Sequence, residues 1–259
     1  MILLKSLASA FLMYSRIPMP NIEWKEENRR YSLCFFPAVG AVIGALFMLC
    51  RHICGLLEFG GFFTGVVLVI IPIIITGGIH LDGFCDVIDA KSSFADKKKR
   101  LEIMSDPHIG SFAVIYLILY FLVQTAVLCE IDKTETALVI AIGFVFSRTL
   151  SGIGAVCFKS AKSEGALQSF VKPAHKKSTL FVLATVNVIA AAAMLCFNVI
   201  AGGFAVLGAI SALIYYRLSA YKNFGGITGD TAGWFLQVCE LTIAIMALVG
   251  EKITEAALL

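Results

Sequence analysis

Residues 111–129, SFAVIYLILYFLVQTAVLC, decide the fold, because they form a long apolar run without a charged side chain. A helix needs roughly 20 mostly apolar residues to cross a bilayer, since its backbone polar groups must be hydrogen-bonded within the segment. The whole chain of 259 residues shares this character, with 59% apolar and 15% charged residues. Soluble proteins average about half apolar and about a quarter charged residues. This composition predicts an integral membrane protein and excludes intrinsic disorder.

Six further apolar runs flank this one on both sides. They cover residues 33–49, 62–79, 136–158, 179–200, 204–221 and 233–249. We therefore predict an all-α polytopic membrane protein of about seven transmembrane helices, with residues 1–259 forming a single integral membrane domain.

Residues 1–17 are apolar but hold Lys5 and Arg16 and stop at Pro18. We interpret them as an interfacial helix that lies on the membrane. A cleaved signal peptide is the alternative, but the basic n-region is poor and no good cleavage site follows.

Basic residues alternate between the connections of these seven runs. Seventeen of the 21 lysines and arginines fall in residues 1–32, 80–110, 159–178 and 217–232, whereas the alternate connections and the tail hold three, Arg51, Lys133 and Lys252. Because basic loops stay in the cytoplasm, we predict a cytoplasmic N-terminus and an external C-terminus. The net charge of +3 is too small to indicate a nucleic-acid partner.

An acidic stretch, HLDGFCDVIDA at residues 80–90, directly follows the second run. On a helix, Asp82, Asp86 and Asp89 fall within about 60° of one another. Like charges on one face repel, and oxygen-only ligands favour Mg²⁺ or Mn²⁺. The pattern indicates a divalent metal site, with a solvated acidic turn as the alternative.

The segment RLEIMSDPHIG follows at residues 100–110, where an amphipathic surface helix over residues 94–104 is predicted to stop at Pro107. Asp106 and His108 lie at this stop, and His108 could be a general base, a phosphate contact or a capped loop histidine. The basic run at residues 97–100 is typical of a solvated or headgroup-facing surface.

A third segment, FGGITGDTAG at residues 224–233, opens the last run. Glycines before a helix N-terminus expose backbone N–H groups that suit phosphate oxygens. Asp230 could be a further metal ligand, the helix N-cap, or both.

Glu240 lies inside the last apolar run, where a carboxylate needs a partner. Arg148 in the fourth span is the natural candidate, as a buried ion pair or as a phosphate clamp. Together these segments predict phosphoryl transfer from an activated donor.

These motifs, with FLMYSRIPMP at residues 11–20, FFPAVGAVIGAL at 35–46, FSRTLSG at 146–152 and KSEG at 162–165, resemble the cobalamin synthase family, also called adenosylcobinamide-GDP ribazoletransferase. The resemblance covers nearly the whole chain in order. It implies a multi-pass enzyme of the cell inner membrane with a cytoplasmic active site, which performs a glycerophosphotransferase-like phosphoryl transfer. It would join adenosylcobinamide-GDP to α-ribazole or α-ribazole 5′-phosphate, release GMP and require Mg²⁺. An oligomer is left open.

The resemblance also implies roles for individual residues. Asp82, Asp86 and Asp89 would hold Mg²⁺, and Asp106 and Asp230 would complete the metal site or orient the attacking oxygen. Phosphate contacts would come from Gly226, Thr228 and Gly229, and also from Arg16, unless Arg16 is an interfacial anchor. His80 lies about 160° from Asp82 on a helical wheel, so it would bind phosphate from a loop conformation or be structural. Glu164 has no assigned role.

Two other functions compete with this one. A CDP-alcohol phosphotransferase also gathers aspartates at a helix end, but its usual Asp-Gly-x-x-Ala-Arg pattern is absent here. A transporter could also place charges inside its spans, although the sequence shows neither repeated halves nor clearly broken helices.

Overall fold

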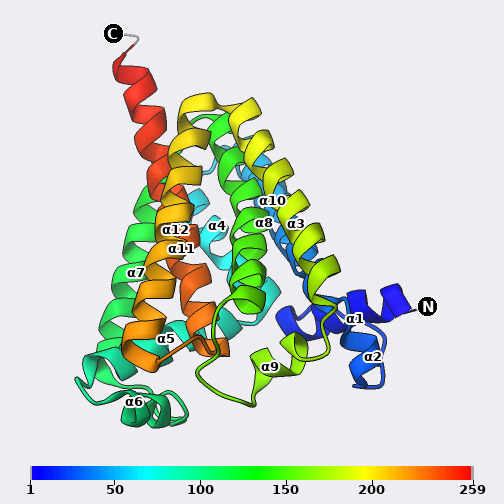
Figure 1. The fold of residues 1–259 in the computed structure, drawn as a ribbon. Coiled ribbons are helices and arrows are strands. Elements are labelled where there is room, and N and C mark those ends of the chain that lie inside the picture. The colour runs from blue at the N-terminus through cyan, green and yellow to red at the C-terminus, as the bar shows by residue number, and fades with distance from the viewer. Residues whose placement is uncertain (1, 258–259) are drawn as a thin grey trace.

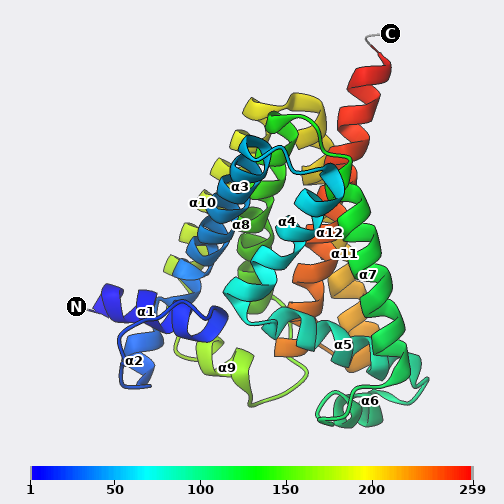
Figure 2. The same cartoon turned by 180° about the vertical axis from the view of Figure 1, so that it is seen from behind.

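The computed structural model describes residues 2–257, and all regular elements in this range are helices (Figures 1 and 2). A single isolated bridge pairs Ser160 with Ile227. The helices longer than fifteen residues are α3 Phe36–Leu56, α4 Gly61–Thr76, α7 Ser111–Cys129, α8 Thr134–Cys157, α10 Lys176–Phe197, α11 Val199–Phe224 and α12 Gly229–Ala256. The shorter ones are α1 Ile2–Tyr14, α2 Glu26–Arg29, the 3₁₀ turn η1 Ser32–Phe35, α5 Ile79–Ser92, α6 Lys97–Ile103 and α9 Ala166–Val171.

Six helices are long and apolar enough to cross a membrane: α3 with the turns before it, α7, α8, α10, α11 and α12. A seventh crossing is formed only if α4 and α5 count as one span, and these two helices are bent by 95° at their junction. The prediction of an all-α protein with about seven apolar spans is therefore confirmed.

The second span is shorter than predicted. We expected it to run to residue 79, but α4 ends at Thr76 after 16 residues, a rise of about 24 Å. Gly77 and Gly78 follow with φ of 65° and 79°, a left-handed conformation that glycine adopts without strain. The chain therefore turns sharply, and α5 lies across the end of the bundle (Figure 2).

Helix α8 is the centre of the bundle and packs against α3, α10, α11 and α12. Its contact with α3 is close because a Cβ at Gly40 would lie 2.3 Å from the Phe144 carbonyl oxygen, and one at Gly44 would lie 2.4 Å from that of Ala141. Small residues let membrane helices approach in this way without a hydrophobic driving force between them.

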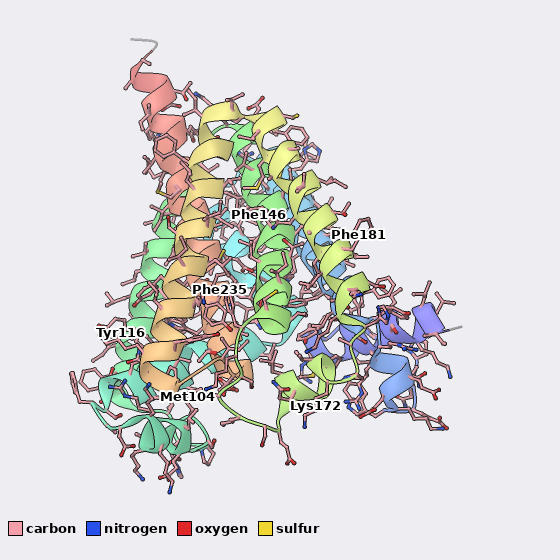
Figure 3. The ribbon with its side chains drawn as sticks, viewed as in Figure 1. Met104, Tyr116, Phe146, Lys172, Phe181 and Phe235 are labelled. Carbon is pink, nitrogen blue, oxygen red and sulfur yellow. The ribbon has the colours of Figure 1, made fainter. Side chains whose placement is uncertain are left out.

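The outer surface of the bundle is apolar. Phe181 is 74% and Tyr116 is 48% exposed, whereas Phe146 and Phe235 are buried in the interior (Figure 3). Exposed apolar side chains continue along α7, α10 and α11, among them Ile118, Leu122, Val188, Ile189, Leu207, Ile214 and Leu218. Such a surface is matched to lipid, as the composition predicts.

Helices α1, α2, α5, α6 and α9 gather at one end of the bundle, which we call the α5 end (Figures 1 and 2). Helix α1 lies crosswise to the long helices there, and exposes Ile2, Leu3 and Leu4. Helix α6 begins later than predicted, because the Asp96 side chain accepts a hydrogen bond from the Lys99 N–H at 2.8 Å and caps it. The three segments with candidate functional residues all reach the α5 end.

Candidate active site

Asp82 and Asp86 on α5 face the beginning of α12, which carries Asp230. The two helices approach closely at Gly83, where a Cβ would lie 2.7 Å from the Asp230 carbonyl oxygen. Burial and then the charges of Asp82, Asp230 and Asp89 raise the pKa of Asp86 to about 7, and the charge of Lys162 opposes them. We call Asp82, Asp86 and Asp230 the acidic cluster. Its charges repel, so the site favours a cation.

A cavity of about 110 Å³ opens beside this cluster and is here called the smaller cavity. Its polar lining includes His80, Asp82, Ser151 and Asp230, and apolar residues of α1, α3 and α8 close it. Gly229, the first residue of α12, also lines it. The positive end of a helix dipole thus lies beside a space with carboxylates, an arrangement suited to phosphate together with a cation.

A larger cavity of about 600 Å³ lies on the other side of Asp82, between α1, the turn at Gly77 and Gly78, and α7. Arg16 lines it and lies against the turn, because a Cβ at Gly77 would meet the Arg16 Nε at 2.3 Å. The Arg16 N–H also donates to the Ile75 carbonyl oxygen at 2.7 Å. Asp82 therefore lines both cavities, and Arg16 places a positive charge in the larger one.

Asp89 is turned away from the acidic cluster. Its carboxylate accepts hydrogen bonds from the Gly110 N–H at 2.6 Å and the Ala113 N–H at 2.9 Å, and so caps α7. Although Asp82 and Asp89 share a face of α5, seven residues separate them by about 10 Å along the helix axis. Residues 2–257 contain no group of three His, Cys, Asp or Glu side chains close enough to hold one ion. Neither the predicted triad of Asp82, Asp86 and Asp89 nor the acidic cluster is therefore assembled as a three-ligand site.

Asp106 and His108 form a separate exposed pair. The Asp106 Oδ1 accepts the His108 N–H at 3.0 Å and lies 2.7 Å from the His108 Nδ1. These hydrogen bonds lower the pKa of Asp106. The pair lines a shallow depression with Asp89 and not either cavity beside Asp82. Of the alternatives for His108, this geometry favours the capped loop histidine.

The predicted phosphate cradle before α12 is mostly structural. Gly226 packs on the 159–161 segment, since a Cβ there would lie 2.5 Å from the Lys159 carbonyl oxygen. The Thr228 hydroxyl accepts the Thr231 N–H at 3.1 Å as the N-cap of α12, and is 3.3 Å from the Asp230 Oδ2. Gly229 alone among the three predicted residues lines the smaller cavity.

A comparison with known proteins bears on what this site does. A family model described as cobalamin-5-phosphate synthase matches residues 6–248. The chain belongs to the cobalamin-5-phosphate synthase family. This confirms the resemblance that the motifs indicated.

Curated relatives of this family match along nearly their whole length and are named adenosylcobinamide-GDP ribazoletransferase. The one from Lachnoclostridium phytofermentans is 43% identical over 250 residues, which cover 96% of this chain and 95% of the relative. Those from Treponema denticola and Clostridium botulinum are 32% and 30% identical and cover 93% and 92% of this chain, and 96% and 95% of their own lengths. No solved structure matches the chain.

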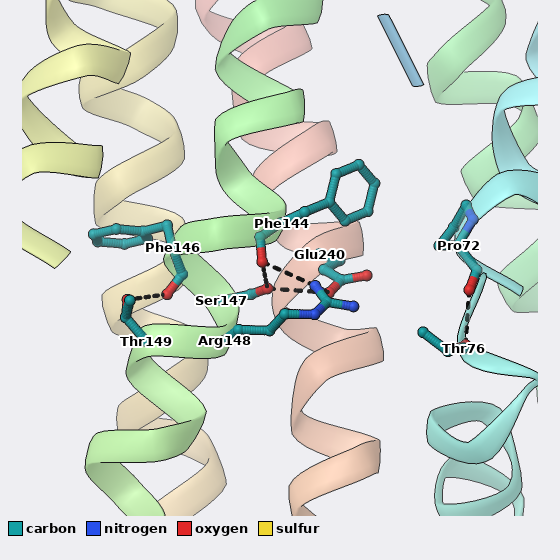
Figure 4. Close-up of polar contacts among 8 residues, drawn as sticks. All are labelled: Pro72, Thr76, Phe144, Phe146, Ser147, Arg148, Thr149 and Glu240. Carbon is teal, nitrogen blue, oxygen red and sulfur yellow. Dashed lines mark hydrogen bonds and ion pairs between the residues drawn. The ribbon is translucent and has the colours of Figure 1, made fainter. Parts of the chain in front are cut away.

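The cobalamin-5-phosphate synthase motif FSRTLSG contributes a buried ion pair behind the smaller cavity. Arg148 Nη1 donates to Glu240 Oε1 at 2.8 Å, and the Ser147 hydroxyl donates to the same oxygen at 3.0 Å (Figure 4). Arg148 is 0% exposed. The ion-pair alternative is confirmed. The smaller and larger cavities do not include Arg148 in their linings, so the structure does not support a direct phosphate clamp.

Sequence reasoning missed Lys162, which belongs to the family-like KSEG segment. Its charge acts on Asp86, and its Nζ donates to the Ser105 hydroxyl at 3.1 Å. Glu164, the other charged residue of that segment, is exposed. A lysine in a loop has no periodicity to mark it, so only the fold reveals that Lys162 approaches the acidic cluster.

Proposed function

We propose that this chain joins adenosylcobinamide-GDP to α-ribazole, or to α-ribazole 5′-phosphate, and releases GMP. The observation that carries the proposal is the match of nearly the whole chain to relatives with the name adenosylcobinamide-GDP ribazoletransferase. The acidic cluster beside two cavities supports it, because the reaction needs a charged diphosphate and a second substrate to meet at one point.

The reaction is a displacement at phosphorus. A ribose hydroxyl of the ribazole, other than the 5′ hydroxyl that carries the phosphate in α-ribazole 5′-phosphate, attacks the phosphorus nearer the corrinoid. The bond from that phosphorus to the GMP oxygen breaks, and the attacking hydroxyl loses its proton. Negative charge develops on the departing GMP. Catalysis of this kind depends on positioning and on electrostatic stabilisation.

The donor set fits Mg²⁺. Asp82, Asp86 and Asp230 offer only oxygen ligands. Although the three do not come together around one point in residues 2–257, Mg²⁺ typically takes only one or two carboxylates with waters and phosphate oxygens. The raised pKa of Asp86 supports a cation at this cluster, because burial and neighbouring carboxylates disfavour its ionised form. Bound here, Mg²⁺ would neutralise charge on the diphosphate and the leaving group. The structure offers no such argument for Asp89, whose oxygens accept backbone N–H groups.

Different residues of the chain line the two cavities and have different roles there. Gly229 and the N-terminus of α12 face phosphate in the smaller cavity, and Arg16 supplies a cation in the larger one. His80 also lines the smaller cavity. Burial, and then the charge of Arg148, lower the pKa of His80 to about 3, which favours its neutral, hydrogen-bonding form. Asp82 lies between both spaces and orients the groups that meet there.

The site belongs on the cytoplasmic side of the inner membrane. Seventeen of the 21 basic residues lie in connections on the side of the α5 end, and basic connections stay inside. An amphiphilic donor suits a site at the membrane surface, beside the exposed apolar residues of α1. The likeness to glycerophosphotransferase chemistry stays a prediction.

Purified protein in lipid nanodiscs tests the proposal directly. With adenosylcobinamide-GDP, α-ribazole and Mg²⁺, we expect equimolar cobalamin and GMP, measured by chromatography, and no product after EDTA until Mg²⁺ is restored. Parallel reactions with CDP-alcohol donors should give no product. Product from those donors alone, or solute movement without release of GMP, would replace the proposal with one of its competitors.

A further inference from the structure

A third cavity, which we call the polar cavity, lies deeper in the bundle, behind His80. It measures about 10 Å³ and lies between α4, α5, α7, α8 and α12. Seven polar side chains line it: Thr76, His80, Tyr120, Gln124, Arg148, Gln237 and Glu240. All seven are at least nine-tenths buried. This volume is about what one water molecule requires, and a polar cavity of that size is normally hydrated.

Three polar atoms of this lining are buried without a hydrogen-bond partner: His80 Nε2, Gln124 Oε1 and Arg148 Nε. They come from α5, α7 and α8. Unpaired buried polar atoms are costly, so three of them around one cavity indicate a shared partner. The other side of Arg148 is already occupied by Glu240 and by the Phe144 carbonyl oxygen (Figure 4).

We propose that the polar cavity binds one ordered water molecule that links Arg148, Gln124 and His80, and that this water holds His80 as the tautomer protonated on Nδ1. One water molecule satisfies all three unpaired atoms. The water accepts from the Arg148 Nε–H and donates its two hydrogens to Gln124 Oε1 and His80 Nε2. A ring nitrogen that accepts leaves the other nitrogen to carry the proton.

The consequence for turnover rests on the proposed function. His80 lines both the polar cavity and the smaller cavity, so the water fixes which ring atom can donate toward the candidate active site. An Nδ1–H fixed in this way is available to donate to a phosphate oxygen. Gln124, Arg148 and Glu240 are then positioning residues that act through His80 and do not touch substrate.

Solid-state ¹⁵N NMR of histidine-labelled protein in liposomes tests the tautomer without any substrate. A His80→Asn variant identifies the His80 signals among those of the four histidines. We expect a single neutral tautomer with the proton on Nδ1. In Gln124→Met, which keeps the side-chain length but removes the acceptor, we expect a mixture of both tautomers, and Gln124→Glu should restore the single one.

Kinetics supply the second readout. Gln124→Met should lower kcat about tenfold with little change in KM, and Gln124→Glu should recover most of that loss. The matched control is Thr136→Val, because the Thr136 hydroxyl is also buried without a partner but does not line the polar cavity. This control should keep the wild-type kcat and His80 spectrum.

Each outcome has one meaning. A wild-type His80 protonated on Nε2, or a Gln124→Met variant with unchanged tautomer and kcat, would overturn the proposal. If Gln124→Met does not fold, the wild-type spectrum still decides. If the wild-type protein makes no cobalamin but His80 has the expected tautomer, the proposed function fails while the water site stands.

Discussion

Two acidic groups at the α5 end differ in what surrounds their carboxylates. In the acidic cluster, burial and neighbouring carboxylates raise the pKa of Asp86 to about 7. In the other group, Asp89 and Asp106 accept backbone N–H groups, and the pKa of Asp106 is lowered. The first arrangement is unfavourable without a cation, and the second stabilises turns and a helix end. Neighbouring carboxylates can thus either favour a cation or stabilise the backbone, and the role depends on whether backbone N–H groups lie close to the carboxylate.

The largest expected effect separates the two groups by activity. Asp82→Asn and Asp230→Asn should each lower kcat about 10³-fold, because each removes a charge from the acidic cluster beside the smaller cavity. Cobalamin formation in nanodiscs measures the loss, and an unchanged elution volume on size exclusion shows that the variant is folded. Near-wild-type turnover in either variant would remove that residue from the site.

Gly83→Ala tests whether the acidic cluster depends on close helix packing. The new Cβ would lie 2.7 Å from the Asp230 carbonyl oxygen, and backbone cannot move aside as a flexible side chain can. A displacement of about 1 Å at a catalytic site can lower the rate about 10²-fold, so we expect a loss of that order in kcat. Gly55→Ala is the control, since a Cβ at Gly55 meets nothing within 4 Å and should leave kcat unchanged. Equal rates for both variants would show that the α5–α12 approach is unimportant.

The sequence predicts the spans well because each spanning helix must itself be long and apolar, whatever its neighbours are. The run at residues 111–129 coincides with α7, Ser111–Cys129. The pairing of Arg148 with Glu240 was also predicted from the sequence, since a charge inside a span needs a partner. These inferences require only the cost of polar groups in a membrane.

The site was predicted only in part, because periodicity gives an angle around a helix and not a position in space. Asp82 and Asp89 share a face, yet Asp82 meets the start of α12 and Asp89 meets the start of α7. Gly226 and Thr228 look like a phosphate loop, but they pack on a neighbouring segment and cap a helix. Only the packing of the helices against one another distinguishes a residue of the candidate site from one that caps a helix or packs on a neighbouring segment.

Asp89→Ala tests the second group through stability. The variant loses two charge-assisted hydrogen bonds to the N-terminus of α7, so we expect a loss of about 1–2 kcal/mol in the free energy of unfolding. Turnover of the folded protein should be largely kept. Asp96→Ala, which removes the cap of the exposed helix α6, should cost less. A folded Asp89→Ala variant as inactive as Asp82→Asn would return Asp89 to the proposed metal site.

The smallest expected effect is a gain in stability from Asp86→Asn in metal-free protein. The folded pKa of Asp86, about 7, exceeds its ordinary value of 3.8, so the folded state binds the proton more tightly. Stability therefore falls as pH rises from 3.8 to about 7, and the whole loss is present at pH 8. Because Asp86 is partly exposed, we expect a discounted gain of about 2–4 °C in Tm at pH 8 for the variant, smaller at pH 5. Mg²⁺ should raise the Tm of wild type more than that of Asp86→Asn, because it relieves the same repulsion. An Asp86→Asn variant that is less stable than wild type at pH 8 without metal would show that the cluster is not strained, and that the two acidic groups do not differ as described.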